Sequence, residues 1–225
     1  MKKLILASAV GVLTSIAAGC GGSSTVKPST LLPEAQRTLN AATSAHFVLA
    51  SRNIPASGTN LRGGDGELAR PDKLRGTFQV QVFGLPATVR AVAISGKFWA
   101  LLPFQPSYKM VNPSEFGLGD PSLLISRDKG LSHLLTELQN PKAVGRERIN
   151  GELVEKIAGT VTGPQIDSFL PDAAPSQPVH LTFAIDPSSH QVRQATATGP
   201  FVSKTTQSSY ILTLTNYNEA VTITP

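Results

Sequence analysis

The stretch GELARPDKLRGTFQVQVFG, residues 66–84, decides the fold of this chain of 225 residues. Between Thr77 and Val82, polar and apolar residues alternate one by one, which is the pattern of a strand with one buried face. The Arg-Pro-Asp sequence at 70–72 interrupts the strand pattern with residues that favour a turn. The stretch therefore predicts two neighbouring strands joined by a short connection, the elementary unit of an antiparallel sheet.

Strand patterns extend outward on both sides of this pair. Two of the connections, Ser95-Gly96 and Asn150-Gly151, have the residue types of two-residue hairpin turns. The runs between such turns are short and rich in β-branched and aromatic residues. They predict further strands within residues 46–52, 87–95, 97–104, 143–163, 178–186, 191–199, 208–218 and 220–225.

Three segments change to a helical period, the shortest of them at residues 163–170. Residues 30–43 carry an apolar stripe at 3.6-residue spacing, with Pro33 in the predicted first turn. Residues 120–140 begin at an Asp-Pro pair, and Pro141 is expected to end this segment. Its leucines lie at i, i+3, i+4 and i+7: Leu131, Leu134, Leu135 and Leu138. About ten strands and a few helices together predict an α+β domain built on one large antiparallel sheet.

The N-terminal residues are typical of a secretory signal. Lys2 and Lys3 precede an apolar run at 4–18, which is short of the roughly 20 residues that cross a bilayer as a helix. Cys20 follows this run, and a chain with one cysteine cannot form an internal disulfide. The sequence Ala-Ala-Gly-Cys at 17–20 resembles the bacterial lipobox, in which the cysteine receives a diacylglyceryl group and becomes the mature N-terminus. We therefore predict that Cys20 is a lipid anchor, and the alternative is a plain signal peptide with an incidental cysteine.

These features divide the chain into three parts. Residues 1–19 are the predicted signal peptide, residues 20–30 are the lipidated cysteine with a flexible tether, and residues 31–225 form one domain. Removal of residues 1–19 takes two lysines away and leaves 18 basic and 15 acidic residues, a formal charge of +3. Such a weak and unclustered charge, together with an export signal, argues against nucleic acid as a partner.

The sequence contains no recognisable catalytic or metal-binding motif. The patterns G-x-S-x-G, H-E-x-x-H, the P-loop and G-x-G-x-x-G are all absent. The histidines are far apart and lack a carboxylate or cysteine at ligand spacing: His46, His133, His180 and His190. Asp65 and Glu67 lie among glycines, which favours a solvated turn over a metal loop. We therefore predict no catalytic residues, no metal site and no cofactor, so that the protein is not an enzyme.

Several predicted strands carry small apolar residues, namely Ala87, Ala91, Ala93, Ala195 and Ala197. Val89, Ala91 and Ala93 share one face of their strand. This face is predicted to point inward, because burying Arg90 on the opposite face without a partner would be costly. Small residues on a concave face leave space between a sheet and a helix, but they also permit close packing of the two. Composition alone favours close packing.

Five blocks of the sequence resemble, in order, the LppX/LprA/LprF/LprG family of actinobacterial lipoproteins. The blocks are SGTNLRGGDGEL (57–68), VAISGKFWALLPF (92–104), NPSEFGLGDPSLLISRDKGLSHLLTELQNPK (112–142), ERINGELVEKIAGTV (147–161) and LTNYNEAVTITP (214–225). The resemblance runs from about His46 to Pro225. Two positions depart from the family pattern, since Trp99 stands where the family has Tyr and the lipobox begins with Ala17.

The resemblance implies a half-barrel of antiparallel strands curled around helices, similar to bacterial lipoprotein carriers of the LolA/LolB type. It also implies a large apolar cavity and transport of multiply acylated lipids or lipoglycans toward the outer envelope. A 16-carbon chain exposed to water costs on the order of 12 kcal/mol, at about 0.8 kcal/mol per CH₂. Transport across an aqueous gap therefore needs a dry compartment, which we expect to exceed an ordinary pocket of roughly 300–1,000 Å³.

The predicted lining of this cavity consists of inward-facing apolar residues, each of which would otherwise be ordinary core. They are Phe78, Val80, Val82, Val89, Ala91, Ala93, Phe98, Leu131, Leu134, Leu135, Leu138, Leu181, Phe183 and Ile185. The predicted partners are an acylated lipid or glycolipid, the extracytoplasmic face of the plasma membrane through the anchor, and a membrane transporter. One alternative is an anchored adaptor with a fully packed interior. Another is an anchored hydrolase, which requires a serine or carboxylate pair that converges in space.

Overall fold

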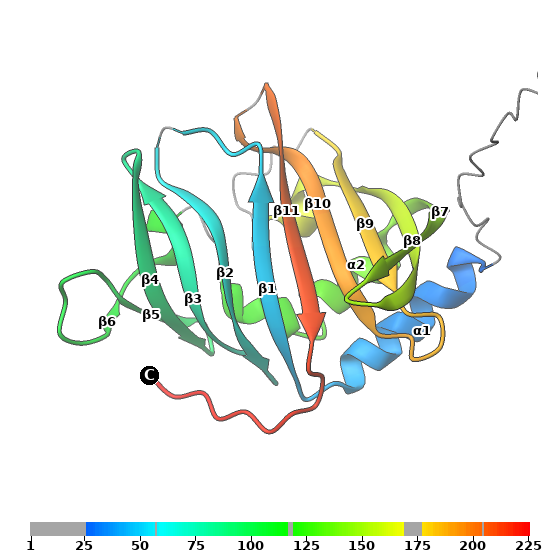
Figure 1. The fold of residues 1–225 in the computed structure, drawn as a ribbon, viewed down its shortest axis with the longest axis horizontal. Helices are drawn as coiled ribbons and strands as arrows, with labels where there is room; N and C mark the ends of the chain where they lie inside the picture. Colours follow the sequence, from blue (N-terminus) through cyan, green and yellow to red (C-terminus); the bar gives the residue numbers. More distant parts are fainter. Residues whose placement is uncertain (1–25, 57, 117–118, 169–176, 204) are drawn as a thin grey trace, which may run out of the picture.

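The computed structural model describes residues 26–56, 58–116, 119–168, 177–203 and 205–225 (Figure 1). Within these residues, eleven strands form one antiparallel sheet that is open and curved. The strands are β1 Ser44–Arg52, β2 Asn60–Ala69, β3 Lys73–Val82, β4 Leu85–Ile94, β5 Lys97–Leu101, β6 Lys109–Met110, β7 Gln139–Ile149, β8 Glu152–Val161, β9 Val179–Ile185, β10 Val192–Ser203 and β11 Thr206–Thr215. The predicted fold class is confirmed.

The helical segments are short, and most of them pack on one face of the sheet or on one another. They are α1 Pro28–Ala41, η1 Pro113–Phe116, η2 Pro121–Ile125, α2 Leu131–Glu137 and α3 Gly163–Ile166. Figure 1 shows α1 and α2 behind the sheet, on the side toward which it curves. The described helices include none that is both long and apolar enough to cross a membrane.

The sheet consists of two meanders joined at its centre. Its strand order is β6-β5-β4-β3-β2-β1-β11-β10-β9-β8-β7, so the two edges are β6 and β7. The central join is the antiparallel pairing of β1 with β11, in which His46 lies opposite Thr215. The connection from β6 to β7 carries η2 and α2 across the concave face, where η2 contacts β2, β3 and β4. Helix α1 packs on α2 and on edge strand β7.

The tight hairpin turns follow the sequence prediction. Ser95 and Gly96 have φ values of 50° and 75°, and Asn150 and Gly151 have values of 50° and 86°. Two successive residues with positive φ match the right-handed twist of the flanking strands. A third turn of this kind, between β3 and β4, places Phe83 at φ 48° before Gly84. The residue types do not predict that turn, because a phenylalanine is rare at positive φ.

The glycine-rich segment before residue 70 is a strand and not the solvated turn that we predicted. Asp65 and Glu67 both lie in β2, and Glu67 Oε1 is 3.0 Å from His46 Nδ1 on neighbouring β1. A Cβ on Gly66 would lie 2.0 Å from the Arg75 carbonyl oxygen on β3. The glycines therefore allow close approach of the strands, a requirement that side-chain alternation does not reveal.

Two helical boundaries also differ from prediction. Helix α1 begins at Pro28, so that Pro33 lies beyond its first turn. The predicted helical segment at 120–140 is divided into η2 and α2, and Pro141 lies inside β7. Proline is tolerated there because β7 is an edge strand, which leaves one side of its backbone free of ladder bonds.

The C-terminal residues 220–225 do not form the predicted strand. Asn216 and Asn218 have φ values of 49° and 65°, which turn the chain away from β11. Ile223 is buried against Val92 and Ala69, in a small cluster separate from the main core. Because Val92 alternates with the inward-facing residues of β4, this cluster lies on the outer face of the sheet. The C-terminal segment therefore covers part of the convex surface.

Candidate functional site

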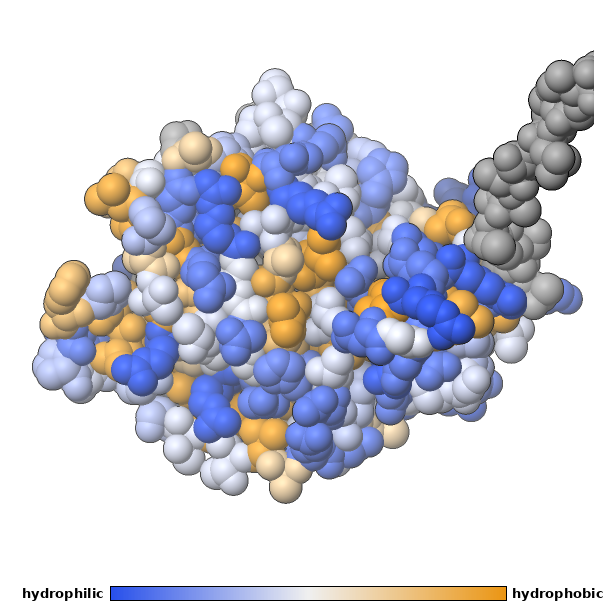
Figure 2. Space-filling view, viewed as in Figure 1, coloured by the Kyte–Doolittle hydropathy of each residue, from blue (hydrophilic) through white to orange (hydrophobic). Residues whose placement is uncertain are grey.

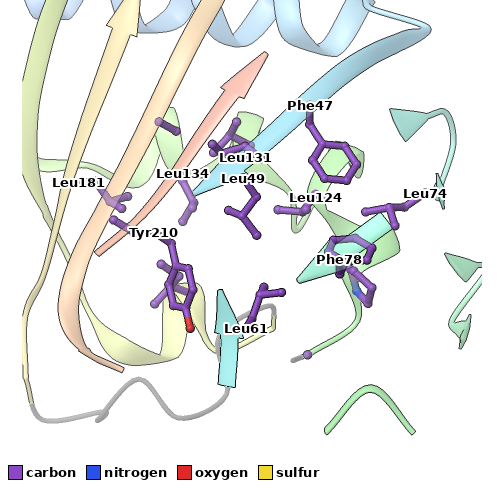
Figure 3. A pocket seen from close by; sticks show the side chains of 16 residues that line it. Phe47, Leu49, Leu61, Leu74, Phe78, Leu124, Leu131, Leu134, Leu181 and Tyr210 are labelled. Atoms are coloured by element: carbon purple, nitrogen blue, oxygen red, sulfur yellow. The ribbon is translucent and has the colours of Figure 1, made fainter. Parts of the chain in front are cut away.

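An apolar cavity of about 110 Å³ lies between the concave face of the sheet and the helices (Figure 3). The sheet contributes residues from six strands of both meanders, and the opposite wall comes from η2, α2 and α3. The lining residues are Phe47, Leu49, Leu61, Leu74, Phe78, Gly119, Pro121, Leu124, Leu131, Leu134, Ile166, Leu181, Ala195, Ala197, Tyr210 and Leu212.

The local periodicity of each element positions these side chains. Phe47 and Leu49 are two apart on β1, and Ala195 and Ala197 are two apart on β10, so each pair faces the same side of the sheet. Leu131 and Leu134 are three apart on α2 and lie on one face of the helix. In Figure 3 these leucines point from the helix toward the side chains of the sheet. Strands and helix thus present two apolar surfaces to one space.

The walls of the cavity offer very little polar chemistry. The side chains that line it are hydrocarbon, with the phenol hydroxyl of Tyr210 as the polar group. The rings of Phe47 and Phe78 stack with their centroids 6.0 Å apart, and the ring of Tyr210 lies 5.7 Å from that of Phe201. Such a surface binds apolar groups through the hydrophobic effect, without a charged group to select a headgroup.

Carboxylates and histidines do not gather into a site in the part of the chain that the structure describes. No group of three or more His, Cys, Asp or Glu side chains is placed to hold a metal ion there. His180 points away from the core, as the alternation of β9 predicts, and His133 is half-buried on α2 near Glu137. Cys20 lies outside the described residues, so its role as an anchor stays a prediction.

Four of the fourteen predicted lining residues lie in the cavity wall: Phe78, Leu131, Leu134 and Leu181. Nine others are buried in the surrounding core: Val80, Val89, Ala91, Ala93, Phe98, Leu135, Leu138, Phe183 and Ile185. Val82 is half-buried against that core. The structure therefore gathers all fourteen around one apolar interior, and their contact with a lipid stays a prediction.

Sequence reasoning missed all of the wall that β1, β2 and β11 provide. Phe47, Leu61 and Leu212 come from strands that lie at the centre of the sheet. The alternation around Phe47 and Leu212 was visible in the sequence, but their central position depends on the pairing of β1 with β11. That pairing joins distant parts of the chain and leaves no local pattern. Leu61 lies in the glycine-rich segment, which was not predicted as a strand.

The small residues have two different roles. The predicted inner face of β4 is correct, since Ala91 and Ala93 are fully buried in the main core while Arg90 is exposed. These two alanines do not line the cavity, and η2 packs against β4. Close helix–sheet packing is therefore their role. Ala195 and Ala197 on β10 do border the cavity, where their small size leaves space.

The expectation of a space larger than an ordinary pocket is wrong for this structure. The volume of about 110 Å³ is below the roughly 300–1,000 Å³ of a typical ligand pocket. The reason is that large side chains from both walls, including Phe47, Phe78 and Leu134, fill most of the space between sheet and helices.

Arg70 holds the helices against one end of the sheet. From the turn between β2 and β3, its Nε donates to the Ala42 carbonyl and its Nη2 to the Leu39 carbonyl, both at 2.7 Å, and its Nη1 donates to the Ile125 carbonyl. Burial lowers the pKa of Arg70 below its ordinary value, and the nearby charge of Arg127 lowers it further. The guanidinium thus joins the C-terminal ends of α1 and η2 to the turn between β2 and β3.

Comparison with known proteins gives a consistent result for nearly the whole chain. Residues 27–223 match the family described as LppX_LprAFG lipoprotein. The lipoarabinomannan carrier protein LprG of Mycobacterium tuberculosis is 28% identical over 239 residues, which cover 99% of this chain and 94% of that protein. LprF of Mycobacterium bovis, provisionally named a diacylated glycolipid transporter, is 25% identical over 237 residues, which cover 96% of this chain and 88% of that protein.

Two crystal structures share the fold. LprF from Mycobacterium bovis superposes with a TM-score of 0.67 at 18% identity, covering 88% of this chain and 96% of that chain. LppX from Mycobacterium tuberculosis gives a TM-score of 0.62 at 20% identity, covering 88% of this chain and 100% of that chain. The large open sheet over a few helices is therefore an architecture that this chain has in common with both proteins.

Proposed function

The chain belongs to the LppX/LprA/LprF/LprG lipoprotein family, and from this premise we propose that it is a membrane-anchored carrier of acylated lipids or glycolipids. The observation that carries the proposal is the hydrocarbon-lined cavity on the concave face of the sheet. Relatives named as a lipoarabinomannan carrier and as a diacylated glycolipid transporter support it. The proposed activity is non-covalent, and no residue is assigned a catalytic role.

Lipid uptake requires the cavity to expand. An acyl chain of 16 carbons must be kept from water along most of its length, and a volume of about 110 Å³ is smaller than an ordinary ligand pocket. The sheet has a continuous hydrogen-bonded ladder, whereas η2 and α2 are short segments on a connection between the two edge strands. We therefore assign the movement to η2 and α2, which separate from the sheet as acyl chains enter.

The proposed anchor places this carrier in the cell envelope. Cleavage before Cys20 and acylation of its sulfur would leave seven residues between the anchor and the first helix, α1 at Pro28. A chain extends at most about 3.3–3.6 Å per residue, so the tether would span at most about 25 Å. The domain would thus stay close to the extracytoplasmic face of the plasma membrane, where a transporter that accepts or supplies lipid is a further proposed partner.

Mass spectrometry of bound lipid tests the carrier function. The test protein spans residues 20–225 and carries Cys20→Ala, so it contains every described helix and strand but has no anchor. It is produced in a host that synthesises glycolipids. The purified protein is expected to release acylated lipids on denaturation. After delipidation it is expected to take up a diacylated glycolipid from detergent in a saturable manner. A folded, delipidated protein that takes up no such lipid would overturn the proposal.

The second candidate function is an anchored adaptor that binds envelope proteins through its surface. The small volume of the cavity favours this function, because an adaptor needs no internal space. The same uptake experiment separates the two candidates. A purified adaptor would not release lipid in stoichiometric amounts, and its thermal stability would not change when acylated lipid is added. A carrier would be stabilised by the added lipid, because the lipid binds the folded state.

A further inference from the structure

Four large apolar side chains are exposed near one edge of the sheet. Phe83 and Leu85 lie at the turn between β3 and β4, Phe104 lies in the loop between β5 and β6, and Met110 lies in β6. Phe83 and Phe104 are almost fully exposed. In Figure 2 apolar side chains project from the left margin of the molecule, over the β3–β4 hairpin and the β5–β6 loop. We call these four residues the docking surface.

The backbone at both phenylalanines is unusual. Phe83 has a φ of 48° and Phe104 has a φ of 65°, a left-handed conformation that is uncommon for a bulky residue. Asparagine or glycine would fit each position better, and asparagine would also be more soluble. Neither local conformation nor burial in the described fold therefore accounts for phenylalanine at these two sites. A contact outside the domain would account for it.

Two basic side chains lie near the docking surface. Strands β3 to β6 contain five basic and no acidic residues, but Lys73, Arg75 and Lys97 lie toward the end of these strands that is opposite the Phe83 turn. Lys109 is exposed next to Met110, and Arg90 is exposed on β4 opposite Leu101, where β5 leads into the Phe104 loop. Exposed aromatic and aliphatic side chains beside basic residues are the pattern of proteins that bind the surface of an anionic bilayer.

The docking surface also lies close to the cavity. Leu61 in the cavity wall pairs with Val80 on β3, two residues before the end of that strand at the Phe83 turn. Helix α1, which follows the tether, packs instead at the β7 edge on the opposite side of the sheet. Helix α1 and the docking surface therefore lie at opposite edges of the sheet.

We propose that Phe83, Leu85, Phe104 and Met110 insert into the headgroup region of an anionic bilayer, with Arg90 and Lys109 facing its phosphates. Phenylalanine and leucine side chains gain by leaving water, and the basic residues gain by approaching negative headgroups. The contact brings one end of the cavity to a lipid surface. The proposal concerns the surface of the domain and does not depend on what the cavity binds.

Cosedimentation with vesicles tests the docking surface, using residues 20–225 with Cys20→Ala so that no acyl anchor contributes. The protein is expected to bind phosphatidylglycerol vesicles and to bind phosphatidylcholine vesicles more weakly. Raising the salt concentration is expected to weaken binding to phosphatidylglycerol, because salt screens exposed charges. Equal binding to both kinds of vesicle, or binding to neither, would overturn the proposal.

The double variant Phe83→Asn/Phe104→Asn separates docking from folding. Asparagine suits positive φ, so the thermal stability should be unchanged or raised. Binding to phosphatidylglycerol vesicles should fall at least about tenfold, since two phenylalanines no longer leave water. Lys109→Gln should weaken binding by about fivefold. A double variant that is stable and binds as tightly as the unchanged protein would overturn the proposal.

The matched control is Val144→Asn/Leu153→Asn, which removes two exposed apolar side chains from β7 and β8 at the other edge of the sheet. This control should bind vesicles as the unchanged protein does, and an equal loss in the control would overturn the assignment to the β3–β6 edge. Lipid uptake is measured separately by mass spectrometry. Failure of the carrier function is therefore distinguishable from failure of docking.

Discussion

At the scale of single residues, alanines in similar strand positions have different surroundings. Ala91 on β4 is completely buried and lies away from the cavity, whereas Ala197 on β10 is half-buried and borders it. The sequence shows both as small residues on alternating strands and does not distinguish them. Their difference arises because η2 packs on β4, while the space opposite β10 is only partly filled.

A tryptophan at each position should therefore have a different effect. Ala197→Trp should fill the cavity, reduce uptake of a diacylated glycolipid at least about tenfold and leave the free energy of unfolding within about 1 kcal/mol, because open space accommodates the indole. Ala91→Trp should lower the free energy of unfolding by about 1–3 kcal/mol or more through overpacking. Denaturant unfolding and lipid uptake are measured on both variants. If Ala197→Trp takes up lipid normally, the cavity is not the lipid-binding site.

At the scale of elements, the attachment of the helices depends on one side chain in a turn. Arg70 was visible in the sequence as part of a turn, but the carbonyl groups that it binds belong to α1 and η2. Hydrogen bonds that involve a charged group contribute about 1.5–3 kcal/mol each to stability, and the cost of burying the charge offsets part of their sum. Arg70→Gln should therefore lower the free energy of unfolding by about 2–4 kcal/mol, measured by denaturant unfolding.

Arg127→Gln is the control for this prediction. Arg127 is exposed and donates a single bond of 3.3 Å to the Asn40 carbonyl on α1, so its loss should change the free energy of unfolding by less than about 1 kcal/mol. Arg70→Gln should also speed the exchange of bound lipid, since η2 is held less firmly to the sheet. If Arg70→Gln and Arg127→Gln had the same free energy of unfolding, Arg70 would not be the residue that fixes the helices to the sheet.

The elements themselves were largely predictable, and their exceptions have physical causes. Period-two alternation and the turn residues at 95–96 and 150–151 predicted the order and type of most strands, because these signals act over a few neighbours. The strand containing Asp65 was partly hidden, since its glycines serve contact between backbones. The segment at 220–225 alternates as a strand does, but it packs on the outer face through Ile223 and forms no ladder.

At the scale of the whole molecule, the anchor should decide location without affecting the fold. All described helices and strands follow Cys20 by at least seven residues. Cys20→Ala in the full chain, expressed in a bacterium that processes lipoproteins, should move the protein from the membrane fraction to the soluble or secreted fraction. A high-salt wash removes protein held by the docking surface alone, because its charges are screened. Retention on the membrane after that wash would mean that another element anchors the chain.

The pairing of β1 with β11 also determines when the domain can become complete. His46 and Thr215 lie opposite each other although they are 169 residues apart in the chain. Each meander contains mainly local pairings, which form early, whereas closing so long a loop is slow. In a chain that leaves an export channel N-terminus first, β1 can pair with β2 early, but its other edge must therefore stay without a partner until almost the last residues have emerged. Complete folding is necessarily a late event, and during that interval the exposed side of β1 is the segment most prone to aggregation.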